Sequence, residues 1–165
     1  MSAKITAIQP QQRNRDRVNI SLDGQYAFSL ARLTAAWLKL GQELSADHIQ
    51  ELLNKDEVET AHNRALHYLS FRARSSAELE RYLQQKEYQV SVIDAVLERL
   101  QEQDFLDDLR FAQDWIENRN TFRPRSRRAL RVELLRKGLP THIIEEALDK
   151  SLPDERAGIL QAGLK

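Results

Sequence analysis

Apolar residues recur at every third or fourth position over most of this chain, which is the spacing that places side chains on one face of an α-helix. The pattern is clearest in residues 74–122, where three such stripes follow one another. The positions expected to face inward are Leu79, Tyr82 and Leu83, then Val92, Ile93, Val96, Leu97 and Leu100, and then Leu109, Ala112, Trp115 and Ile116. We therefore predict a three-helix unit over residues 74–122.

Polar residues in front of these stripes indicate where the helices begin. Ser75 and Glu78 have the S-x-x-E form of a capping box, in which each side chain binds the other residue's backbone N–H. Ser91 and Asp107 are expected to cap the next two helices, because a serine or aspartate oxygen accepts a hydrogen bond from the first helical turn.

The same pattern returns 51 positions later. This shift places Ser75 on Ser126 and Lys86 on Lys137. It also places apolar residues on apolar ones, since Leu79, Leu83, Val92, Ile93, Val96 and Leu97 fall on Leu130, Leu134, Ile143, Ile144, Ala147 and Leu148. One shift that matches two helices and their connection indicates an internal repeat.

Two further units are predicted on either side of the clearest one. Residues 123–165 form the later unit, with a first helix beginning near Pro124 and a short closing helix at Pro153–Leu164. Residues 31–73 form the earlier unit, in which the pattern is weaker. Its helices are expected at Ala31–Leu40, around Ile49, Leu52 and Leu53 after a Ser45 cap, and at Val58–Arg72. Tandem three-helix repeats that contact only their neighbours should form an elongated, curved body.

Residues 1–30 have the alternation typical of strands instead. The stretches 17–22 and 25–30 alternate polar and apolar residues, and the dipeptide Asp23-Gly24 between them is a turn signal that tolerates positive φ. We predict a β-hairpin, with Ile5–Ile8 as a candidate third strand. A hairpin alone is marginal in water, so it should pack on the first helix that follows. The predicted fold is mainly α with this small N-terminal β element.

Composition narrows the class of protein. The 165-residue chain has 41% hydrophobic and 30% charged residues, which suits a folded protein, and without cysteine it has neither disulfides nor thiolate chemistry. No apolar run approaches the roughly 18 residues of a membrane span, and the N-terminus has no signal-peptide core. We expect a cytoplasmic protein without a membrane partner, and a monomer because no long heptad pattern remains.

Charge is unevenly distributed although the net charge is zero. Residues 98–117 are acidic, whereas residues 119–137 carry eight basic side chains and one acidic residue, Glu133. The two stretches either pair internally or form a surface with a negative and a positive side.

The basic stretch is also the candidate binding site. Leu130 and Leu134 fall on one face of a helix, and Val132 and Leu135 share the other side with arginines. Exposed aliphatic groups among guanidinium groups are typical of interfaces. The predicted partner-binding or DNA-binding residues are Arg119, Arg123, Arg125, Arg127, Arg128, Arg131, Arg136 and Lys137.

No pattern of a known catalytic centre or cofactor site occurs in the chain. His62 and His67 are five residues apart, which is not the spacing of a zinc motif, and both are expected at the solvated surface. Asp104, Asp107 and Asp108 suggest a metal-dependent nuclease, but Asp107 as a helix cap explains them better. We expect no enzymatic activity, no metal and no cofactor.

The two tryptophans differ in what their positions predict. Trp115 lies on an inward stripe and is expected in the core rather than as a stacking platform for bases. The sequence does not decide whether Trp37 is buried or exposed, because the predicted hairpin can cover it.

Several segments together resemble the RecX family of bacterial regulatory proteins. They are FLDDLRFAQDWIENR, then FRPRSRRALRVELLRKGLP and IIEEAL, with SSAELERYLQQK before them. They cover about residues 66–148, and GQYAFSL is similar to the start of longer members that begin with a β element. A glycine that is common in the family shortly before the basic helix is absent, with Thr121-Phe122 in its neighbourhood.

The resemblance implies a non-enzymatic modulator of the recombinase RecA, acting in recombination and DNA repair. Such a protein lies in the groove of the RecA filament on single-stranded DNA, restrains its ATPase and strand exchange, and makes at most weak direct contact with DNA. Arginine suits an acidic protein surface or phosphate equally, because its planar fork binds both. The alternative is a helical DNA-binding protein that acts without RecA through residues 125–137. A nuclease that uses the aspartates ranks last.

Overall fold

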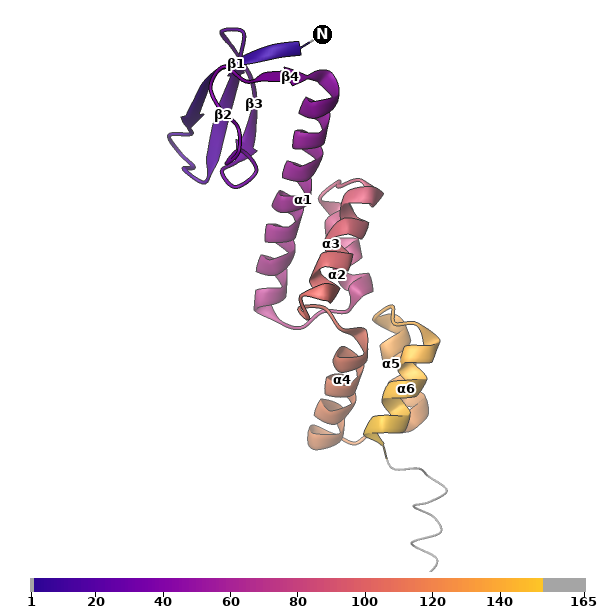
Figure 1. The fold of residues 1–165 in the computed structure, drawn as a ribbon. Helices are drawn as coiled ribbons and strands as arrows, with labels where there is room; N and C mark the ends of the chain where they lie inside the picture. The colour runs from indigo at the N-terminus through magenta and orange to yellow at the C-terminus, as the bar shows by residue number, and fades with distance from the viewer. Residues whose placement is uncertain (1, 153–165) are drawn as a thin grey trace, which may run out of the picture. The chain divides into compact units, whose positions relative to one another are not determined.

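The computed structural model describes residues 2–152 (Figure 1). Its strands are β1 (Ser2–Pro10), β2 (Arg17–Leu22), β3 (Gln25–Ala31) and β4 (Glu43–Ser45), and its helices are α1 (Ala46–Phe71), α2 (Ser76–Gln85), α3 (Val90–Glu102), α4 (Asp108–Phe122), α5 (Arg127–Arg136) and α6 (Thr141–Ser151). The described residues form two compact units, one of residues 2–66 with 88–96 and one of residues 67–87 with 97–152. The predicted mainly helical fold with an N-terminal β element is confirmed. None of these helices is long and apolar enough to cross a membrane.

The first unit begins with an antiparallel sheet in the strand order β3-β2-β1-β4. β2 and β3 form the predicted hairpin, in which Ile20 lies opposite Phe28. Their turn holds Asp23 at φ 50° and Gly24 at φ 85°, the positive values that a two-residue hairpin turn needs. The third strand is confirmed as β1, which is longer than predicted, and β4 was not predicted.

One apolar cluster joins this sheet to the start of α1. Its buried members are Ile5, Val18, Ile20, Leu30, Ala35, Leu44 and Leu52. Asp56 of α1 reinforces the contact, since one carboxylate oxygen lies 3.0 Å from the Arg17 guanidinium and the other accepts a 2.6 Å hydrogen bond from the Ala31 N–H. The hairpin therefore packs on a helix, as predicted, but that helix is α1 and not the one predicted at Ala31–Leu40.

The prediction of three helices in residues 31–73 was wrong. Ala31 ends β3, and the next eleven residues form turns and loops before β4, because Ala35 and Leu38 pack against the sheet instead of forming a helix face. The two helices predicted after Ser45 are one, since no glycine or proline interrupts the 26 residues of α1. Ser45 does cap it, accepting a hydrogen bond from the His48 N–H. Trp37 is 90% exposed, so the hairpin does not cover it.

The 51-residue repeat is visible in the helix boundaries. α2 and α5 are both ten residues long, and each has a serine at its N-cap and a lysine at its C-cap: Ser75 and Lys86, then Ser126 and Lys137. α3 and α6 begin 51 positions apart, and so do the ends of α1 and α4, at Phe71 and Phe122. The repeat thus consists of the end of α1 with α2 and α3 (the first repeat), and of α4, α5 and α6 (the second repeat).

The first residues of the helices show which of the predicted N-terminal caps form. Ser75 and Glu78 form the capping box, and the Asp107 carboxylate accepts from the Arg110 N–H at the start of α4, both as predicted. Ser91 lies inside α3 rather than at its cap, because that helix begins one residue earlier. Ser126 caps α5, so the start predicted near Pro124 was too early. The predicted closing helix and the boundary at residue 165 lie outside the described residues.

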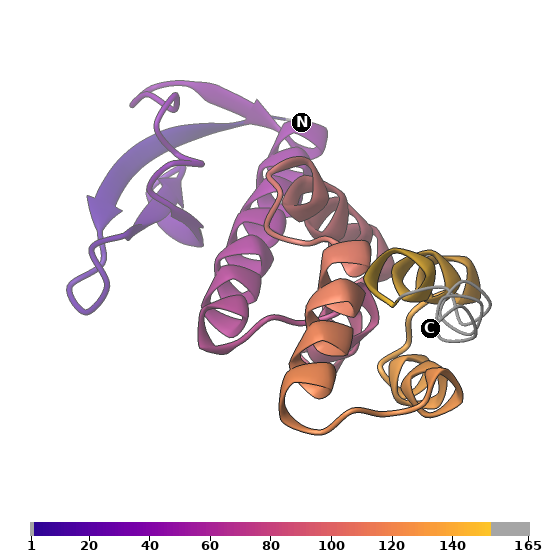
Figure 2. The ribbon, with the colours of Figure 1, turned by 90° about the horizontal axis from the view of Figure 1, so that it is seen from below.

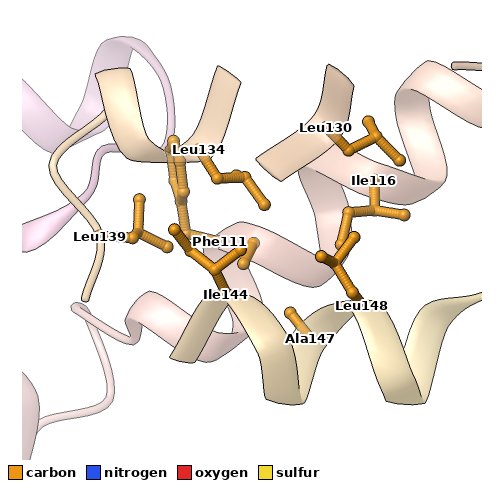
Figure 3. Packing of buried hydrophobic residues seen from close by; sticks show 9 residues of the cluster. Phe111, Ile116, Leu130, Leu134, Leu139, Ile144, Ala147 and Leu148 are labelled. Atoms are coloured by element: carbon orange, nitrogen blue, oxygen red, sulfur yellow. The ribbon is translucent and has the colours of Figure 1, made fainter. Parts of the chain in front are cut away.

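The second repeat has its own core, formed by side chains of α4, α5 and α6 and of the loop before α6. Figure 2 shows the backbones of these three helices. Figure 3 shows these side chains pointing toward one another from the three helices and the loop before α6. They are Phe111, Ala112, Ile116, Leu130, Leu134, Leu139, Ile144, Ala147 and Leu148. The predicted burial of Leu130 and Leu134 is confirmed, and it fixes which side of α5 faces outward.

α2 contacts the second repeat through its first turn. The Ser75 hydroxyl donates a 2.7 Å hydrogen bond to the Lys137 carbonyl at the end of α5. Next to it Gly138 has φ +81°, and a Cβ atom there would lie 2.4 Å from the Ala77 Cβ. Only glycine combines the positive φ with this close approach.

Replacing this glycine should therefore destabilise the protein. We expect Gly138→Ala to lower the free energy of unfolding by roughly 2 kcal/mol or more, because a steric clash adds to the backbone strain. Gly24→Ala is the matched control, since Gly24 also has positive φ but nothing within 4 Å of its missing Cβ. Urea denaturation followed by circular dichroism measures both, and equal losses in the two variants would refute the close-approach explanation.

Candidate macromolecule-binding surface

α5 has two sides of different chemistry. The Ser126 hydroxyl accepts a 3.1 Å hydrogen bond from the Ala129 N–H, which starts the helix in a register that turns its leucines inward. The outward side carries two exposed arginines with two exposed aliphatic residues between them. They are Arg128, Val132, Leu135 and Arg136, and we call them the outer face of α5.

Two of the predicted binding residues are held by α6. Arg127 forms ion pairs with Asp149 and with Glu145, the second at 3.7 Å. Arg131 binds the same Glu145 through both carboxylate oxygens, with one N–O distance of 3.1 Å. This hydrogen bonding lowers the pKa of Glu145 and raises the pKa of Arg131, and it outweighs the opposite effect of burial on each.

Two more are held around Trp115. Arg119 lies 3.2 Å from Glu133, and the indole N–H of Trp115 donates a 2.8 Å hydrogen bond to the same carboxylate. Arg119 and Lys137 also lie over the indole ring, 4.9 and 5.1 Å from its centre. Trp115 is half-buried and packs against the second core, so its expected core position is confirmed for the buried part of the ring only.

Lys137 has a second ionic contact, with α2. Its ammonium lies 3.7 Å from the Glu78 carboxylate, which also faces Arg72 at 3.4 Å and Arg74 at 4.0 Å. The carboxylate attracts all three cations, and its single negative charge offsets one of their three positive charges. Lys137 is therefore largely committed to the fold.

The remaining four predicted residues are exposed, and none has an ion pair within residues 2–152. They are Arg123, Arg125, Arg128 and Arg136. The structure thus divides the eight basic residues into four that hold the fold and four that are available to a partner. Basic residues of the stretch 119–137 do form ion pairs inside the protein. Most of these pairs are with carboxylates of α6, and within residues 2–152 none is with the acidic stretch at residues 98–117.

The other predicted chemistry finds structural explanations. Asp107 caps α4, and Asp108 accepts a 2.8 Å hydrogen bond from the Ser76 N–H. Within residues 2–152 no group of histidine, aspartate and glutamate side chains is arranged to hold a metal ion. His67 is at the surface as expected, but His62 is only 4% exposed, so its predicted solvated position was wrong. His62 lies on the buried side of α1, next to the buried residues Ala61 and Ala65.

One hollow on the surface of the second repeat was not predicted from the sequence. It has a volume of about 400 Å³ and is lined by Trp115, Asn118, Arg119, Phe122 and Arg123. Phe122 is 84% exposed there. The available signal was the dipeptide Phe-Arg, which occurs at both ends of the 51-residue shift.

The contacts of Glu145 predict how stability depends on pH. Since the folded-state pKa of Glu145 lies below its ordinary value of 4.5, its ionised form stabilises the fold above that pH, and this contribution is lost as the pH falls through the lowered pKa. Glu145→Gln should therefore unfold at lower urea concentration than the native protein at pH 7, with a smaller difference at about pH 3. Glu146→Gln is the control, because the ion pair of Glu146 in the described part of the chain is with its own-helix neighbour Lys150 and not with α5. A difference for Glu145→Gln that does not change with pH would contradict this assignment.

Three family models match the chain. The N-terminal domain of regulatory protein RecX matches residues 3–45, the first RecX three-helix domain matches residues 61–100, and the second matches residues 107–148. The two helical matches coincide with the end of α1 through α3 and with α4 through α6. They confirm tandem three-helix domains, but they match two of them, with bounds that differ from the predicted units at residues 74–122 and 123–165.

Curated proteins and solved structures agree with these matches. The regulatory protein RecX of Halalkalibacterium halodurans is 37% identical over 99% of this chain and 64% of its own length, and that of Bacillus subtilis is 39% identical over 87% of this chain and 55% of its own length. The chain thus spans between half and two thirds of the length of these relatives.

A crystal structure of regulatory protein RecX superposes with a TM-score of 0.77 at 28% identity, covering 92% of this chain and 75% of that one. The structure of RecX from Lactobacillus salivarius shares the fold, with a TM-score of 0.54 at 24% identity over 57% of this chain and 61% of its own. This chain belongs to the RecX family of regulatory proteins.

Proposed function

We propose that this protein regulates RecA by binding the RecA filament on single-stranded DNA and inhibiting its ATPase and strand exchange, without catalysis of its own. Membership of a family of regulatory proteins supports this role. The observation that carries it is the outer face of α5, where arginines without ionic partners in residues 2–152 flank exposed aliphatic side chains. The role is exercised in the cytoplasm by a monomer that binds a polymeric partner.

The outer face of α5 combines two kinds of contact. Val132 is 42% exposed and Leu135 is 50% exposed, which provides apolar area that a partner can bury. Arg128 and Arg136 are eight residues apart, so they emerge about 12 Å from each other along the helix axis. Each can bind a carboxylate or a phosphate through two parallel hydrogen bonds. This composition matches protein interfaces, which have an apolar core, a polar rim and more arginine than the rest of the surface.

The basic residues of α5 that form ion pairs hold the helix in place and so fix the position of its outer face. Arg127 and Arg131 tie α5 to α6, while Lys137 ties its end to α2. The outer face is therefore ordered before a partner arrives, so little further ordering is needed on binding. A rigid helix face is better suited to a regular filament surface than a mobile loop is.

Direct duplex-DNA binding through residues 125–137 is the second candidate. The exposed Arg123 and Arg125 before α5 favour it, because they extend the unpaired positive charge beyond the helix. It requires tight binding to naked duplex DNA with a steep salt dependence, about −0.9 in log–log slope for each neutralised phosphate. The formal net charge of zero argues against it.

Reversing the charge of the outer face should remove the inhibition of RecA. We expect Arg128→Glu/Arg136→Glu to need at least about tenfold more protein than the native chain to halve ATP hydrolysis by RecA on single-stranded DNA, because opposed charges become like charges across the interface. Folding should be intact, since neither arginine has an ion pair within the described residues.

The matched control is Arg13→Glu/Arg15→Glu, which makes the same change of net charge at two exposed positions of the loop after β1. It should inhibit like the native protein. Equal inhibition by all three proteins would exclude the outer face of α5 as the contact. No inhibition by the native protein at any ratio would refute the proposed function, and titration with duplex DNA would then decide the second candidate.

A further inference from the structure

In both repeats the last residue of the first helix is a solvent-exposed phenylalanine, and an arginine follows it. Phe71 closes α1 and is 71% exposed, and Phe122 closes α4 and is 84% exposed. Arg72 and Arg123 follow them, 51 positions apart. Exposing one large apolar side chain is ordinary, but exposing it at the same place in both repeats indicates a use outside the core.

The surroundings of Phe122 form a built site. Trp115, Asn118, Arg119 and Phe122 are spaced i, i+3, i+4 and i+7, so they lie along one face of α4. With Arg123 they line the hollow of about 400 Å³. The indole is fixed by its hydrogen bond to Glu133 and by the two cations over its ring. The hollow therefore has aromatic rings and guanidinium groups on its wall and an exposed amide between them.

The first repeat also gathers aromatic and cationic groups around its phenylalanine, although most of them come from positions that carry other residue types in the second repeat. His67 packs edge-on against Phe71 with 5.0 Å between ring centres. Tyr68 stacks on Tyr82 at 4.0 Å, and the Arg74 guanidinium lies 4.1 Å from the centre of the Tyr68 ring. Aromatic and cationic groups thus gather at the end of the first helix in each repeat.

Flat rings beside guanidinium groups fit one class of ligand particularly well. Bases of a single nucleic-acid strand stack on aromatic side chains, while the phosphates between them bind arginine. Duplex DNA does not offer its base faces, because they are covered by neighbouring pairs. An acidic peptide matches the arginines but gives no reason for an exposed phenylalanine in both repeats.

We propose that the end of the first helix in each repeat is a binding site for single-stranded DNA. Phe122 stacks on a base, and Arg123 and Arg125 bind the adjacent phosphates. Phe71 and Arg72 repeat the arrangement. This binding needs no RecA and uses a different part of the molecule from the outer face of α5.

The site at Phe122 should bind DNA more tightly than the site at Phe71. In the first repeat the Glu78 carboxylate holds Arg72 and Arg74, at 3.4 and 4.0 Å. The equivalent residue of the second repeat is Ala129, so Arg123 and Arg125 have no such carboxylate and keep their charge for phosphate. Phe122 therefore marks the principal site and Phe71 the weaker one.

The test is binding of a short fluorescent oligo-dT strand at low salt, measured by fluorescence anisotropy on the full chain. Phe122→Ala should weaken binding roughly tenfold, the usual effect of losing one base–aromatic stack, and Phe71→Ala should weaken it less. Phe105→Ala is the control, because Phe105 is also exposed, at 58%, but lies outside both sites. It should bind like the native protein.

A strand of the same length without bases separates stacking from charge. It should bind more weakly than oligo-dT to the native protein and about equally to Phe122→Ala. In a Trp37→Phe background, where Trp115 is the remaining tryptophan, oligo-dT should quench the indole fluorescence.

Three results would overturn the proposal. They are no binding of oligo-dT by the native protein, equal binding of strands with and without bases, and unchanged affinity of Phe122→Ala. If Phe122→Ala bound DNA normally but lost inhibition of RecA, the hollow would be a protein contact instead. Because anisotropy is measured without RecA, failure here is distinct from failure of the proposed function.

Discussion

The contact between the first turn of α2 and the end of α5 is the constraint on which the presented surface depends. The Ser75 hydroxyl bonds to the Lys137 carbonyl at 2.7 Å, and Gly138 permits the backbone to approach Ala77. The same approach directs the Lys137 ammonium to Glu78 and to the ring of Trp115. With the buried leucines beneath it, α5 is held at its end and along its inner side. Its outer face is consequently rigid, and rigidity lowers the entropic cost of binding.

The two repeats share helix boundaries but differ at the residues that control charge. Tyr68 and Tyr82 stack in the first repeat, and the equivalent residues of the second, Arg119 and Glu133, form an ion pair. Glu78 has no acidic counterpart in the second repeat. In the first repeat a carboxylate lies beside Arg72 and Arg74, whereas the equivalent Arg123 and Arg125 have no ion pair within the described residues. The two repeats thus differ in whether the arginines after their first helix have a carboxylate partner.

Local signals made much of this fold predictable. The capping box at Ser75, the Asp23-Gly24 turn and the periodicity of Leu130 and Leu134 each depend on neighbouring residues, and each was confirmed. Residues 31–45 were mispredicted because apolar groups such as Ala35 can cover a sheet as well as form a helix face. Which arginines are free could not be predicted, since pairing depends on Glu145 and Asp149, which are brought close only by the packing of α6. The exposure of Phe122 is likewise a property of the folded chain.

The central claim is that the outer face of α5 contacts the RecA filament, and site-specific photo-cross-linking tests it most directly. A benzophenone amino acid replaces Val132, between the two free arginines, or Tyr26, which is 64% exposed on β3 and serves as the reference. We expect a covalent adduct with RecA from position 132 on filaments assembled with single-stranded DNA, and little or none from position 26. An adduct from position 26 alone, or equal adducts from both, would contradict it.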